Sequence, residues 1–103
     1  MTVKEYVDEV LCAPVTRIGT RYIVEAIELV LDTHDIKFYP RLSQILQCPT
    51  SRLEKGIRDA RSLSLRYMSD TDREQIFGEE APSNSQYILR AAEYYRRNYE
   101  NKE

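Results

Sequence analysis

Five lysine and arginine side chains are concentrated in one short segment of this 103-residue chain. Residues 50–68 hold five Lys or Arg against two Asp or Glu, whereas the whole chain carries a net charge of −2. Guanidinium and ammonium groups bind phosphate, and they also reach the acceptor atoms on guanine edges. The local electrostatic field near a polyanion matters more than the total charge of the protein. We therefore expect this segment to make the contacts with an anionic partner.

The charged and apolar residues of this segment separate onto two sides if it forms a helix. At about 100° per residue, Lys55, Arg58, Ser62 and Arg66 fall within about 60° of Ser51. The opposite side holds apolar or small residues, namely Leu53, Gly56, Ile57, Ala60, Leu63 and Tyr67. Small residues permit close approach of a second helix, so we expect this side to face the core. The other side is then a basic strip that fits the major groove of DNA.

The residue types on this strip suit contacts to DNA. The residues expected at base edges are Glu54, Lys55, Arg58 and Asp59. The residues expected at phosphates are Thr50, Ser51, Arg52, Arg61 and Ser62. Arg58 matches guanine O6 and N7 in a bidentate way, and Glu54 accepts from a cytosine amino group. Hydroxyls and the first N–H groups of a helix suit a phosphate.

Simpler roles compete for the same residues. A charged strip on an amphipathic helix is often only its solvated face. Ser51 and Glu54 have capping-box spacing, so Glu54 is also a candidate for stabilising the helix start. Glu54 and Arg58 are four residues apart and suit an ion pair with each other. Asp59 is a negative charge that opposes close phosphate contact.

The pattern along the rest of the chain predicts an all-α fold. Three Gly, four Pro and long stretches of 3.6-residue periodicity favour a compact six-helix domain over residues 1–103. The expected helices span residues 2–11, 19–32, 40–47, 51–68, 70–77 and 84–99. Thr2 and Glu5 predict a capping box, and the third helix is expected to turn Leu42, Ile45 and Leu46 inward. The third and fourth helices and the turn between them predict a helix-turn-helix.

Most catalytic and metal sites are excluded by composition. The chain has one His, and its two Cys, Cys12 and Cys48, are far apart and expected to be small buried residues. No nucleophile–base pair or Gly-rich phosphate loop is present, so we expect no enzyme activity, cofactor, metal or small-molecule ligand. No apolar run approaches the roughly 20 residues of a membrane span, and no signal peptide opens the chain. The expected location is the cytoplasm.

Several stretches of this sequence occur together, in this order, in one family. They are Leu11–Ile18 with its Pro, Glu25-Ala26-Ile27, Tyr39-Pro40, the run Thr50–Ala60, Ile76-Phe77-Gly78 and Pro82–Ile88. Over roughly residues 10–97 the chain resembles the C-terminal DNA-binding effector domain of the stage-zero sporulation response regulator family. The Ser-Arg-x-Glu-x-x-Ile-Arg core and the Pro-x-Asn-Ser block together make this resemblance specific.

The resemblance implies a six-helix DNA-binding domain without enzymatic activity. In the family the fourth helix enters the major groove, and the matching groove-facing positions are Glu54, Lys55 and Arg58, with Ser51, Arg52 and Asp59 nearby. Family domains bind DNA as tandem pairs, and the matching contact segments are residues 71–77 and 85–90. The family commonly has Arg at position 55 and His at position 59, which predicts an altered target site or weaker binding here.

The family's effector domain follows a receiver domain, and no receiver lies within these 103 residues. A second hypothesis therefore remains open, in which the chain is a helical interaction module that pairs with or antagonises a full-length regulator without binding DNA. The acidic flanks and Asp59 favour this alternative.

Overall fold

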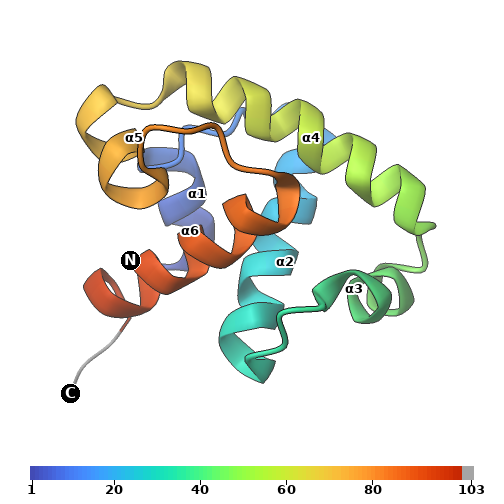
Figure 1. The fold of residues 1–103 in the computed structure, drawn as a ribbon. Coiled ribbons are helices and arrows are strands. Elements are labelled where there is room, and N and C mark those ends of the chain that lie inside the picture. Colours follow the sequence, from blue (N-terminus) through green and yellow to red (C-terminus); the bar gives the residue numbers. More distant parts are fainter. Residues whose placement is uncertain (101–103) are drawn as a thin grey trace.

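The computed structural model describes residues 1–100, which form helices joined by short links and contain no strand (Figure 1). The helices of this part of the chain are α1 (Val3–Glu9), α2 (Ile18–Thr33), α3 (Phe38–Leu46), α4 (Thr50–Tyr67), α5 (Asp70–Phe77) and α6 (Asn84–Asn98). The predicted all-α class with six helices is confirmed. None of these helices combines the length and apolar character needed to cross a membrane.

The start of α1 follows from local sequence, whereas its end does not. The Thr2 hydroxyl accepts a hydrogen bond from the Glu5 N–H, and the Glu5 carboxylate accepts one from the Thr2 N–H, so the predicted capping box is present. The hydrogen bond from the Thr2 N–H to the carboxylate is the main cause that lowers the pKa of Glu5. The helix ends at Glu9, two residues earlier than predicted, and the chain beyond it turns away at Cys12, which adopts a left-handed conformation (φ 55°).

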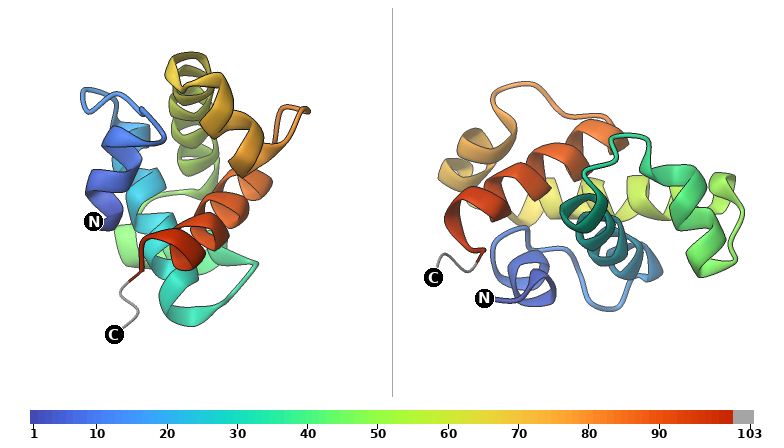
Figure 2. Two further views of the ribbon diagram at one scale, coloured as in Figure 1. Left: turned by 90° about the vertical axis from the view of Figure 1, so that its left-hand side faces the viewer. Right: turned by 90° about the horizontal axis from the view of Figure 1, so that it is seen from below.

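α2 is the central element of the fold. It packs against α1, α3, α4 and α6. Seen from below, α2 lies between α3 on one side and α1 and α6 on the other (Figure 2). The largest fully buried side chains come from five of the helices and from the α1–α2 link: Tyr6, Val7, Leu11, Ile23, Ile27, Phe38, Leu42, Leu53, Ile57, Ser64, Tyr87 and Ile88.

Two glycines set how closely α4 lies on α2. A Cβ atom added to Gly19 would stand 1.8 Å from the Gly56 carbonyl oxygen, and one added to Gly56 would stand 2.9 Å from the ring of Tyr22. Only hydrogen at these positions allows the two backbones to approach this far. The small residues expected on the inner side of α4 therefore have the packing role that the sequence predicted.

A buried hydroxyl ties three parts of the chain together. Ser64 on α4 donates a hydrogen bond to the Leu11 carbonyl oxygen at 2.5 Å. Since a hydroxyl has one proton, Tyr87 on α6 donates to Ser64 at 2.6 Å. The sequence pattern did not identify Ser64, although it lies within the apolar arc of the helix, because serine is ordinarily a surface residue.

Three predicted inward side chains lie differently. Ile45 is 56% exposed, because the side of α3 that carries it borders an open groove. Tyr67 is 59% exposed, since it lies in the last turn of α4, beyond Ser64, the last fully buried residue of that helix. Cys48 is buried as expected, but Cys12 is only partly buried. A periodic pattern predicts which side of a helix turns inward, but not how far the covering elements extend.

Candidate nucleic-acid interface

The link between α3 and α4 is short and held by hydrogen bonds. Gln47 takes a left-handed conformation (φ 49°) that ends α3, and the Cys48 N–H donates to the Ser43 carbonyl oxygen at 3.1 Å. The Ser43 hydroxyl donates to the Cys48 carbonyl oxygen at 2.6 Å. Figure 1 shows α3 and α4 joined by this link at one end of the molecule. Since α3 also packs against α4, the direction of α4 is fixed by its neighbour.

α4 presents opposite sides to the core and to the surface. Its buried residues are Leu53, Ile57, Ala60 and Ser64. All nine predicted site residues lie on this helix and none is buried: Thr50 and Arg61 are partly exposed, and Ser51, Arg52, Glu54, Lys55, Arg58, Asp59 and Ser62 are exposed. The basic strip is therefore accessible along the length of the helix.

No carboxylate of residues 1–100 forms an ion pair with a cation of the strip. Within residues 1–100, the ion pairs join Asp70 to Arg73 and Glu93 to both Arg96 and Arg97. The expected pairing of Glu54 with Arg58 does not occur within this part of the chain. The Arg58 guanidinium remains available to another partner.

The start of α4 has a different cap from the one that the spacing of Ser51 and Glu54 suggested. Pro49 is the N-cap, and its carbonyl oxygen accepts from the N–H groups of Arg52 and Leu53 at 3.0 and 3.1 Å. No side chain caps this end, so the capping box predicted for Ser51 and Glu54 is wrong. The proline side chain has no hydrogen-bond acceptor, so it cannot cap the first N–H groups of α4. Thr50 is partly exposed and Ser51 is exposed at this helix start.

The first turn of α6 lies beside α4, which the sequence did not predict. The Asn84 side-chain amide donates to the Glu54 carbonyl oxygen at 2.9 Å. Between the two helices is a groove of about 310 Å³ lined by Tyr39, Glu54, Arg58, Arg61, Ser83, Asn84 and Ser85. Burial raises the pKa of Tyr39 at one side of this groove, and the Asn84 amide opposes part of that rise. The only sequence signal for this site was the Pro-Ser-Asn-Ser block at residues 82–85.

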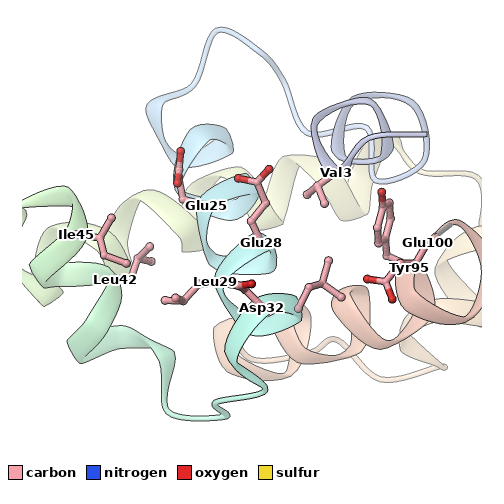
Figure 3. Close-up of a pocket in the computed structure, with 10 residues that line it drawn as sticks. Val3, Glu25, Glu28, Leu29, Asp32, Leu42, Ile45, Tyr95 and Glu100 are labelled. Atoms are coloured by element: carbon pink, nitrogen blue, oxygen red, sulfur yellow. The ribbon is translucent and has the colours of Figure 1, made fainter.

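A second and larger groove of about 510 Å³ is acidic (Figure 3). Its carboxylates are those of Glu25, Glu28, Asp32 and Glu100, set among apolar side chains of α1, α2 and α3. Burial raises the pKa of Glu28, and the neighbouring Glu25 raises it further. No residue of α4 lines this groove, so the acidic surface and the basic strip are separate.

Comparison with known proteins found no matching protein-family model and no matching curated protein.

Proposed function

We propose that this chain is a sequence-specific regulator of transcription that binds double-stranded DNA, as the effector domains of the sporulation regulator family do. In this proposal α3, the link Gln47–Pro49 and α4 form a helix-turn-helix, and α4 enters the major groove. The observation that carries the proposal is the exposed strip on α4, whose cations have no ion-pair partner among residues 1–100, opposite a side that is packed into the core. The cytoplasm, where the chromosome of a bacterium lies, is the proposed location.

Each part of α4 has a proposed contact. Lys55 and Arg58 read base edges in the middle of the helix, with Glu54 and Asp59 beside them. Arg52, Arg61 and Ser62 hold the flanking phosphates. Thr50 and Ser51 add hydroxyl and amide donors at a helix start that no side chain occupies. Phosphate contacts position the helix, and base contacts supply the specificity.

The acidic remainder of the molecule supports one orientation on DNA. The charge of residues 50–68 is positive, while the chain as a whole is at −2. The acidic groove has no α4 residue in its lining, and its carboxylates repel phosphates. The α4 strip is therefore the favourable surface for binding DNA. Tandem pairing through residues 71–77 and 85–90 is proposed from the family resemblance.

Selection from a random duplex library tests the proposal. Bound sequences should converge on a short element, and affinity for that element should fall steeply from about 50 to 200 mM salt, because counterions are released from neutralised phosphates. Failure to enrich any sequence, together with binding that does not depend on salt, would reject the proposal.

The same selected duplex separates the proposal from its alternative. An interaction module without DNA activity would be retained by a full-length sporulation-type regulator and not by the duplex. The DNA-binding proposal predicts retention by the duplex in the absence of any regulator.

A further inference from the structure

We propose that the groove between α4 and the start of α6 is a binding site for a single phosphate oxyanion, formed by Arg61 and the first backbone amides of α6, with Arg58 at the edge nearest the exposed strip. The assignment of this phosphate to the DNA backbone rests on the function proposed above. This contact comes from outside the helix-turn-helix, because sixteen residues separate the end of α4 at Tyr67 from the start of α6 at Asn84.

Arg61 is a partly buried cation without a partner. It lines the groove, and within residues 1–100 it makes neither an ion pair nor a hydrogen bond. Removing a guanidinium from water has a free-energy cost unless an anion or hydrogen-bond acceptor replaces the lost water. The field of Arg61 reaches into the protein, where it opposes the rise in the pKa of Tyr39 and of Tyr87. An anion in the groove would supply the missing partner.

The α6 start offers two further donors to the same groove. Four N–H groups at a helix start have no intrahelical acceptor. The capping box uses the outer two, since the Ser83 N–H donates to the Gln86 side chain at 3.0 Å and the Gln86 N–H donates to the Ser83 hydroxyl at 3.2 Å. The N–H groups of Asn84 and Ser85 remain without a partner in the described part of the chain, and both residues line the groove.

The position of α6 is fixed before any ligand binds. The hydrogen bond from Asn84 to the Glu54 carbonyl oxygen joins the start of α6 to α4. The lining side chains carry one carboxylate, Glu54, against two guanidinium groups, so the site favours an anion. The positive end of the α6 dipole adds to this field.

The position of the groove favours a phosphate of the DNA backbone. Arg58 belongs both to the groove and to the exposed strip of α4, so a duplex on the strip brings its backbone to this edge. A phosphodiester has two free oxygens, so one can accept from the N–H groups of Asn84 and Ser85 while the other accepts from the Arg61 guanidinium. Free inorganic phosphate shares this chemistry.

The first arm of the test uses inorganic phosphate alone. The ¹⁵N-labelled protein is titrated with phosphate in place of chloride at constant ionic strength. The Asn84 and Ser85 amides and the Arg61 guanidinium should shift in a saturable way, and Arg61→Gln should weaken the effect several-fold. Arg61→Lys, which keeps the charge, should weaken it less, and Lys4→Gln on α1 is the charge-matched control. No shift at Asn84 and Ser85, or equal shifts in Arg61→Gln and Lys4→Gln, would overturn the proposal.

The second arm identifies the source of the phosphate. Single neutral methylphosphonates are placed along the selected duplex. At one position the methylphosphonate should weaken binding of the wild type but cause no further loss of binding by Arg61→Gln. The salt slope measured with Arg61→Gln should be smaller than that of the wild type by about one. Additive losses at every position would contradict the assignment to the DNA backbone. If phosphate binds in the first arm and no duplex binds, the oxyanion site stands and the proposed function fails.

Discussion

At the residue scale, the proposed function divides the side chains of α4 into those expected to select a sequence and those expected only to attract DNA. Arg58 is exposed, has no ion-pair partner within residues 1–100 and lies in the middle of the strip. Arg52 is also exposed but lies six residues earlier, at the flank of the helix start. The two arginines therefore have the same charge and different expected contacts.

Replacing each of these arginines by alanine should separate the two roles. Arg58→Ala should lower the affinity for the selected site by about 1–3 kcal/mol while leaving non-specific binding largely unchanged. Arg52→Ala should weaken binding to all duplexes alike and reduce the salt slope by about one. Fluorescence anisotropy on the selected and a scrambled duplex measures both effects. Equal loss of specificity in the two variants would contradict this division.

Sequence reasoning at the residue scale succeeded where burial follows from helical periodicity. Leu53, Ile57 and Ala60 were expected inside and are fully buried. It failed at Ser51 and Glu54, because a proline at the N-cap removes the reason for a capping box, and the residue that occupies the N-cap depends on how the link enters the helix. It also failed for Asn84, whose contact with α4 spans thirty residues of sequence.

At the scale of the elements, the close packing of α4 against α2 determines how far the strip protrudes. The contact depends on Gly19, at which a Cβ atom would meet backbone and not a movable side chain. Sequence alone indicated that Gly56 and Ala60 were small residues on the inner side of α4. It did not identify Gly19 as the partner, since pairing of two helices is a property of the tertiary fold.

Gly19→Ala should therefore destabilise the protein, despite the higher helix propensity of alanine. We expect a loss of about 2 kcal/mol or more in the free energy of unfolding, because the clash with the Gly56 carbonyl oxygen forces the two helices apart. Gly56→Ala should cost less, since it meets the ring of Tyr22. Urea unfolding measures both, with Ser62→Ala on the exposed side of α4 as the control. A Gly19→Ala variant as stable as the control would show that the two helices are not in close contact.

At the scale of the whole molecule, the core contains tyrosines that must stay protonated. The Tyr6 hydroxyl donates to the Ala91 carbonyl oxygen at 2.8 Å, and the Tyr87 hydroxyl bonds Ser64. Burial raises the pKa of both side chains above the ordinary value of 10.0. In the unfolded chain they lose their protons above about pH 10, whereas the fold keeps them protonated.

The contribution of these tyrosines to the free energy of unfolding should therefore be constant below pH 10 and fall as the pH rises above it. For each buried tyrosine, the free energy of unfolding should fall by up to about 1.4 kcal/mol per pH unit in that range. Urea unfolding between pH 8 and 11.5 should show a smaller slope in Tyr87→Phe than in the wild type. The control for the substitution itself is Tyr67→Phe, since Tyr67 is 59% exposed. A slope unaffected by Tyr87→Phe would be inconsistent with burial of this hydroxyl.

The molecule as a whole is polarised, with cations on α4 and carboxylates in the groove between α1, α2 and α3. Sequence counts revealed that residues 50–68 are positive, because charge in one helix is a local property. They could not reveal the acidic groove, whose carboxylates at positions 25, 28, 32 and 100 come together only when α2 and the end of the described chain meet.

The central claim is that binding to DNA depends on the position of the α4 cations and not on net charge. The direct measurement compares two variants with the same charge, Lys55→Gln/Arg58→Gln on the strip and Lys4→Gln/Arg96→Gln on α1 and α6, by anisotropy on the selected duplex. The strip variant should bind at least tenfold more weakly than the wild type, and the other should stay within about twofold. Equal losses in the two variants, or unchanged binding by the strip variant, would contradict the claim.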